Sequence, residues 1–73
     1  MAIFKMFTGP CTVSEVASKL RNSGMPVWME GTEAVYFVRS PRGNADLGDT
    51  AFGLQLEVEK VYGQAAGYRV HPA

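Results

Sequence analysis

Hydrophobic residues near the N-terminus form a short run that a charged residue interrupts only once. Residues 2–8 contain four large apolar side chains and a single charge, Lys5, and the run stops at Gly9-Pro10. A short apolar run that ends at turn residues predicts a β-strand. Because successive side chains of a strand point to opposite faces, the position of Lys5 predicts that Phe4 and Met6 point toward the core.

The next segment changes from the period of a strand to the period of a helix. Thr12 and Glu15 have the spacing of a capping box, in which each side chain bonds to the backbone N–H of the other residue. Four apolar residues then recur at helical spacing and make one face of a helix over residues 12–23: Val13, Val16, Ala17 and Leu20. Gly24 follows the last turn, where a left-handed glycine commonly ends a helix.

Two further strands are predicted by β-branched and aromatic residues. They cover residues 26–30 and 33–39, and Gly31-Thr32 supplies a short connection that closes a hairpin. A turn and a polar loop follow, from residue 41 to residue 49. The last apolar segment, residues 68–71, predicts a final strand.

Residues 50–62 fit two patterns. Apolar residues alternate with polar or small ones at Phe52, Leu54, Leu56 and Val58, which is the period of a strand. The Leu, Gln, Glu and Lys content of the segment favours a helix, and Gly63 is placed to end it. The helical reading gathers five apolar residues on one face: Ala51, Leu54, Val58, Val61 and Tyr62. We expect the helix and keep the strand as the alternative.

With this helix the order of elements is βαββαβ. That order is the ferredoxin-like split βαβ arrangement, a four-stranded antiparallel sheet with two helices on one face. The alternative order, βαββββ, places one helix on a curled antiparallel sheet. Both belong to the α+β class, and the 73 residues are expected to form a single small domain.

The composition is that of a folded domain with few of the groups that catalysis needs. Hydrophobic residues make up 47% of the chain and charged residues 19%, which excludes a disordered chain. One cysteine, Cys11, and one histidine, His71, leave no internal disulfide and no cluster of metal ligands. Since a tunable base and an activated nucleophile are both scarce, we expect no enzyme, no metal and no cofactor.

Aromatic residues on the sheet are the first candidates for a binding site. Helices that cover one face of a sheet leave the other face open, and four aromatic residues fall on the predicted strands: Phe7, Trp28, Tyr36 and Tyr68. Exposed rings of this kind contact a protein partner or stack on nucleic-acid bases. The alternative is that most of these rings fill the core or the seam of a dimer.

Arginines and the cysteine are weaker candidates. Arg39 and Arg42 flank the predicted turn and have the chemistry to hold a phosphate or a carboxylate, although an ordinary solvated loop is the favoured interpretation. Together with Arg69 they would be the cations of a nucleic-acid site, which a net charge of zero disfavours. Cys11 lies beside a predicted helix start, but nothing in the sequence brings His71 to it as a base.

We therefore expect a small non-enzymatic module that binds a protein through an exposed sheet face or edge; inhibition or modulation of a larger complex is one role that suits a domain of this size. Nucleic-acid binding is the alternative, and a small enzyme comes third. The predicted edge strands, 26–30 and 66–71, carry few charges, and unprotected edges pair with other chains, so we expect a homodimer. A free cysteine without an export signal predicts the cytoplasm, and no segment is long and apolar enough to predict a membrane span.

Overall fold

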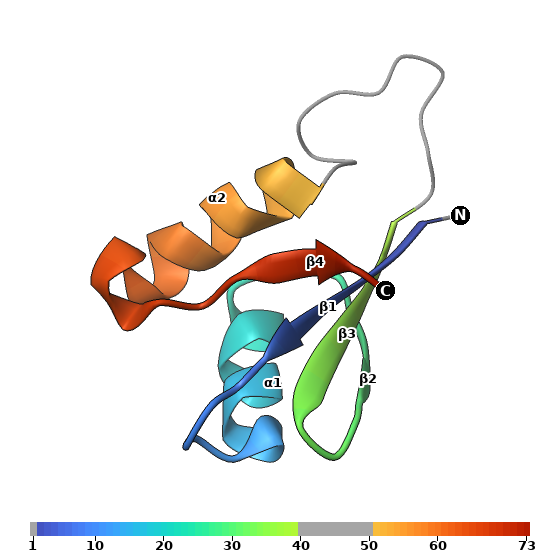
Figure 1. Cartoon of the computed structure of the whole chain (residues 1–73), viewed down its shortest axis with the longest axis horizontal. Helices are drawn as coiled ribbons and strands as arrows, with labels where there is room; N and C mark the ends of the chain where they lie inside the picture. The colour runs from blue at the N-terminus through green and yellow to red at the C-terminus, as the bar shows by residue number, and fades with distance from the viewer. Residues whose placement is uncertain (1, 40–50) are drawn as a thin grey trace.

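The structure, a computed structural model, describes residues 2–39 and 51–73. Its elements in chain order are β1 (Ala2–Phe7), α1 (Val13–Asn22), β2 (Val27–Glu30), β3 (Ala34–Arg39), α2 (Ala51–Tyr62), the short 3₁₀ helix η2 (Gln64–Ala66) and β4 (Val70–Pro72). Within the described residues the strands form one sheet in the order β2-β3-β1-β4, and each neighbouring pair is antiparallel (Figure 1). The predicted α+β class, with a four-stranded antiparallel sheet and two α-helices, is confirmed.

Residues 51–62 are a helix, and the alternative that placed strands in this segment is wrong. Leu54 and Val58 are buried on the inner side of α2, whereas Phe52 and Leu56 are exposed. A strand would have pointed all four side chains to one face of a sheet. The helix separates them into a buried pair and an exposed pair, so the core has to accommodate only half of this apolar surface.

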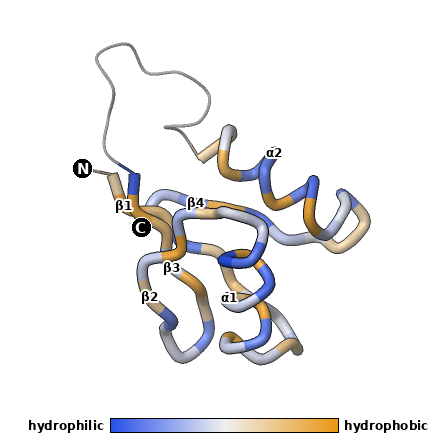
Figure 2. The backbone as a smooth tube through the Cα atoms, turned by 180° about the vertical axis from the view of Figure 1, so that it is seen from behind, coloured by the Kyte–Doolittle hydropathy of each residue, from blue (hydrophilic) through white to orange (hydrophobic). Residues whose placement is uncertain are grey.

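One face of the sheet and both helices share a single core. Phe4 and Met6 of β1 lie opposite Phe37 and Val35 of β3, and all four side chains are buried, which confirms the predicted inward face of β1. The same cluster contains the buried residues of both helices: Val16, Ala17, Leu20, Leu54 and Val58. Both helices therefore cover the same face of the sheet. Hydrophobic stretches run along β1 and β3, and hydrophilic and hydrophobic residues alternate along the helices (Figure 2).

Both ends of α1 are capped as the sequence predicted. The Thr12 hydroxyl accepts the N–H of Glu15 at 3.3 Å. At the other end Gly24 has a φ of 84°, and the N–H groups of Gly24 and Met25 donate to the carbonyls of Arg21 and Leu20 at 2.9 and 3.0 Å. These two hydrogen bonds together form the Schellman motif. Met25 is also buried in the core, which supplies the hydrophobic contact that usually accompanies this motif.

Replacing Thr12 with alanine is expected to lower the free energy of unfolding by about 1 kcal/mol. The substitution removes the acceptor for the Glu15 N–H at the first turn of α1. Urea denaturation followed by circular dichroism measures the loss, and Ser18→Ala, at an exposed position inside the same helix, is the control. If Thr12→Ala were as stable as the unmodified chain, this cap would not hold the helix start.

The side chain of Gln55 joins α2 to the start of β4. Its amide nitrogen donates to the Tyr68 carbonyl at 2.7 Å, and its amide oxygen accepts the Val70 N–H at 2.8 Å. The amide of Gln55 thus gives these backbone groups one hydrogen-bond donor and one acceptor, as a neighbouring strand would. The last strand begins at Val70 rather than at Tyr68, because the segment before it is held by a side chain instead of a strand.

Candidate binding face and adjoining pocket

The face of the sheet opposite the helices follows from the strand register. Lys5 of β1 pairs with Tyr36 of β3 and with His71 of β4, and Tyr36 pairs with Met29 of β2. Directly opposed residues of antiparallel strands share a face. We define the open face by these residues and by the pairs on either side of them: Ile3, Lys5, Phe7, Met29, Ala34, Tyr36, Val38 and His71.

Apolar side chains dominate the open face. Ile3, Phe7 and Met29 are 36%, 48% and 42% exposed, although each is a large hydrophobic residue. Tyr36 and Val38 are half-buried beside them. Lys5 is the only Lys, Arg, Asp or Glu on this face, and its Nζ lies 5.2 Å from the centroid of the Phe7 ring. A partner that covered the open face would therefore have one such charge to remove from water.

Two of the predicted aromatic residues lie on or beside the hairpin of β2 and β3. Trp28 is 52% exposed on β2, where the register with β3 shifts between Val27 and Met29. The ring of Tyr36 lies against Gly31, since a Cβ at that glycine would be 2.9 Å from Tyr36 Cε2. Glycine at this turn position thus makes room for the ring at the β2 side of the open face.

The backbone donors on the outer edge of β4 are largely unavailable to another chain. The strand order confirms that β2 and β4 are the outer strands of the sheet. On β4 the Val70 N–H is already bonded to Gln55, and Pro72 has no N–H to offer. A second chain would find few free donors along β4, so the outer edge of this strand is poorly suited to pairing with another chain.

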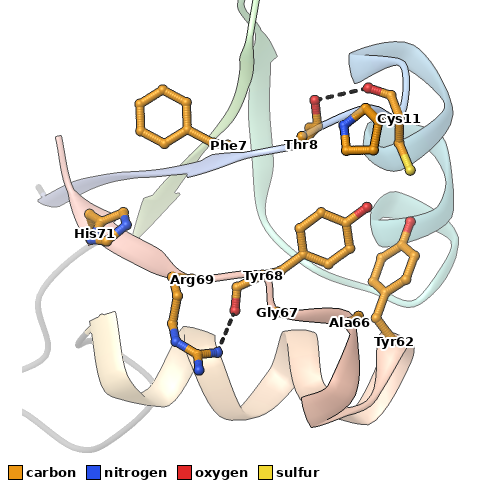
Figure 3. Close-up of a pocket in the computed structure, with 11 residues that line it drawn as sticks. Phe7, Thr8, Cys11, Tyr62, Ala66, Gly67, Tyr68, Arg69 and His71 are labelled. Atoms are coloured by element: carbon orange, nitrogen blue, oxygen red, sulfur yellow. Dashed lines mark hydrogen bonds between the residues drawn. The ribbon is translucent and has the colours of Figure 1, made fainter.

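A pocket of about 540 Å³ lies where β1 ends, between the β1–α1 connection and the chain that leads from α2 to β4 (Figure 3). The rings of Phe7, Tyr62 and Tyr68 line it. Thr8, which is buried, donates its hydroxyl hydrogen to the Cys11 carbonyl at 3.1 Å and so fixes the loop at the rim. Of the predicted aromatic set, Phe7 borders both the open face and this pocket, whereas Tyr68 belongs to the pocket.

Cys11 and His71 both line the pocket but do not form a pair. Figure 3 draws them at opposite ends of it, with the ring of Tyr68 between them. The ring of His71 lies 6.5 Å from that of Phe7, whereas the pKa of the Tyr68 hydroxyl responds to Cys11. The arrangement does not place the imidazole where it would take a proton from the thiol.

The two pocket tyrosines are held in their protonated form. Their rings meet edge to face, with centroids 4.8 Å apart. The hydrogen bond with the Cys11 side chain, followed by burial, raises the pKa of Tyr68 to about 12 from 10.0. Burial raises the pKa of Tyr62, and the nearby Cys11 and Glu15 raise it further. Both hydroxyls therefore remain hydrogen-bond donors at neutral pH.

Alkaline titration should show a tyrosine that ionises late. Because the pKa of Tyr68 is higher in the folded chain than in the unfolded chain, its contribution to stability is complete below pH 10 and is lost as pH rises toward about 12. The near-ultraviolet absorbance of tyrosinate measures the step, and Tyr68→Phe should remove it. If the step persisted in Tyr68→Phe, the late ionisation would belong to another tyrosine.

The candidate arginines are dispersed. Arg39 lies opposite Ala2, on the helix side of the sheet, where its Nη2 is 2.7 Å from Glu57 Oε2. Arg69 is exposed at the pocket and donates to the Tyr68 carbonyl at 3.1 Å. Arg42 falls outside the described residues. The described arginines thus do not gather on the open face.

Within residues 2–39 and 51–73, no group of three or more His, Cys, Asp and Glu side chains is placed to hold a metal ion. No helix in this same part of the chain is both long enough and apolar enough to cross a membrane. The chain matches no family model, no curated protein and no solved structure. Its function has to be inferred from its surfaces.

Proposed function

We propose that this chain is a non-enzymatic protein-binding module and that the open face of its sheet is the binding surface. The observation that carries the proposal is the exposure of Ile3, Phe7 and Met29 together on one face, beside the half-buried Tyr36 and Val38. Contiguous apolar surface commonly marks a site of protein interaction. Side chains on paired strands are already ordered, so their immobilisation costs little on binding.

The partner that we propose first is a second copy of the chain. A core of this size supplies only about 3–5 kcal/mol, so covering further apolar surface would add useful stability. A two-fold axis through the open face would set Ile3 and Met29 of one copy against the same apolar face of the other. The occupied outer edge of β4 favours this face-to-face mode over joining the sheets edge to edge at β4.

The nucleic-acid alternative is less well supported by these side chains. Arg39 is paired with Glu57 and lies on the opposite side of the sheet from Phe7 and Tyr36. On the central strands, a stacking surface on the open face would therefore have Lys5 as its nearest cation. One cation is too few to neutralise the several phosphates of a bound nucleic acid.

We also infer that the arrangement is a ferredoxin-like split βαβ fold. Support comes from the interleaving of the strands: β3 lies between β1 and β2, and β1 lies between β3 and β4. Each helix therefore connects two strands that are separated by a third. The exposed thiol of Cys11 supports a reducing compartment, and we propose the cytoplasm.

Sedimentation equilibrium with matched lysine substitutions tests the proposed surface. The unmodified chain is expected to be a dimer at micromolar concentration, and Met29→Lys is expected to be a monomer because two lysines would be buried without partners. Phe52→Lys is the control, since Phe52 is 59% exposed on α2 and lies outside the open face. A monomeric unmodified chain would refute the homodimer. Dissociation by Phe52→Lys but not by Met29→Lys would show that the interface lies on α2 instead of on the open face.

A further inference from the structure

The pocket beside β1 has the size and the walls of a small-molecule site. Its volume of about 540 Å³ falls within the range of ligand pockets, roughly 300–1,000 Å³. It is built from two stretches far apart in sequence, residues 7–11 and residues 62–71. The buried Thr8 and the Gln55 bonds to the Tyr68 and Val70 backbone hold these two sides in place, so the pocket is formed before any ligand arrives.

The walls of the pocket suit a flat aromatic group. Phe7, Tyr62 and Tyr68 present rings to it, and contacts outside the pocket fix two of them. Lys19 Nζ lies 4.6 Å from the centroid of the Tyr62 ring, and Lys5 Nζ lies over the ring of Phe7. The Tyr62 ring also packs edge to face against the ring of Tyr68. Rings that are already oriented can pack against an inserted ring without a further ordering cost.

The charges around the pocket favour an anion. None of the eleven described residues that line it carries a carboxylate, whereas Arg69 and His71 are both basic. In the described part of the chain Arg21 and Arg39 each pair with a glutamate, but the recorded bond of the Arg69 guanidinium is to the Tyr68 carbonyl. The Tyr62 hydroxyl, which remains protonated at neutral pH, adds a donor rather than negative charge.

We propose that this pocket binds a small aromatic carboxylate, with its ring among Phe7, Tyr62 and Tyr68 and its carboxylate at Arg69. A guanidinium matches a carboxylate with two parallel hydrogen bonds, which fixes the orientation of the bound molecule. The pocket shares Phe7 and His71 with the open face, but Tyr62, Tyr68 and Arg69 lie outside that face and Met29 does not line the pocket. A monomeric Met29→Lys chain should bind the same ligand.

A pair of isosteric probes, 2-naphthoate and the uncharged 2-naphthamide, tests this assignment by amide chemical-shift titration. Saturable shifts are expected at Gly9, Cys11 and Gly67, with naphthoate bound about fivefold more tightly because Arg69 is exposed and its ion pair is partly screened. Arg69→Gln should bring naphthoate to the affinity of naphthamide. Arg21→Gln, whose arginine pairs with Glu30, should leave both affinities unchanged.

Three outcomes would overturn the proposal. The first is the absence of saturable shifts around the pocket with either probe. The second is a set of shifts that centres on the open face, at Lys5 and Tyr36, instead of at the pocket. The third is equal affinity for the two probes, or an Arg69→Gln variant that keeps the preference for naphthoate. Unchanged amide spectra of the free variants would show that each substitution left the fold intact.

Discussion

Replacing Phe37 with alanine is expected to lower the free energy of unfolding by about 3–5 kcal/mol. Phe37 is completely buried on β3, between Phe4 of β1 and Val27 of β2 in the register of the sheet. Its ring belongs to the same core cluster as the buried residues of both helices, so truncation would open a cavity in that core. A single core of this size supplies only about 3–5 kcal/mol, and the variant should therefore be largely unfolded at room temperature.

Urea denaturation at one fixed protein concentration measures this loss, with Phe52→Ala as the matched control. The control deletes the same atoms from a side chain that is 59% exposed on α2, where a substitution should change stability by less than about 0.5 kcal/mol. A folded Phe37→Ala chain, or equal losses in the two variants, would contradict the assignment of the core.

The second large effect is expected at Gln55. Gln55→Met keeps the length of the side chain but removes both hydrogen-bonding groups, so the Val70 N–H loses its partner and the Tyr68 carbonyl keeps only its bond from Arg69. One unsatisfied N–H and one lost bond to a carbonyl at a part-buried position should cost about 1–3 kcal/mol. The loss should act first on β4, because that strand has only three residues and depends on these bonds.

Hydrogen exchange of the Val70 amide, together with urea denaturation, checks this expectation. Exchange should be faster in Gln55→Met than in the unmodified chain. Gln64→Met makes the same chemical change at an exposed position of η2 and should have no effect. If exchange at Val70 stayed the same in Gln55→Met, the strand would not depend on the glutamine.

Local sequence signals predicted the elements whose causes are local. The Thr12 cap, the left-handed Gly24 and the inward face of β1 each depend on residues within a few positions of one another. The segment at 50–62 was ambiguous because Leu54 and Val58, four residues apart, fit both periods. Phe52 and Leu56 fit only the strand period, and their exposure depends on how much surface the rest of the fold can cover.

Features that depend on distant contacts were not visible in the sequence. Tyr68 lies in the pocket rather than on the open face because η2 and the bonds from Gln55 delay the start of β4. The pairing of Arg39 with Glu57 joins residues 18 positions apart and removes that arginine from the candidate site. The pocket itself combines two distant segments, and no residue spacing along the chain signals it.

The central claim, that a second copy covers the open face, is tested most directly by an isotope-filtered nuclear Overhauser spectrum. The sample mixes ¹³C-labelled and unlabelled chains, so that only contacts between copies give a signal. We expect signals from the methyl groups of Ile3 and Met29 to protons of Tyr36 and Val38 in the other copy. No signals between copies, or signals that arise from Phe52 and Leu56 instead, would contradict the claim.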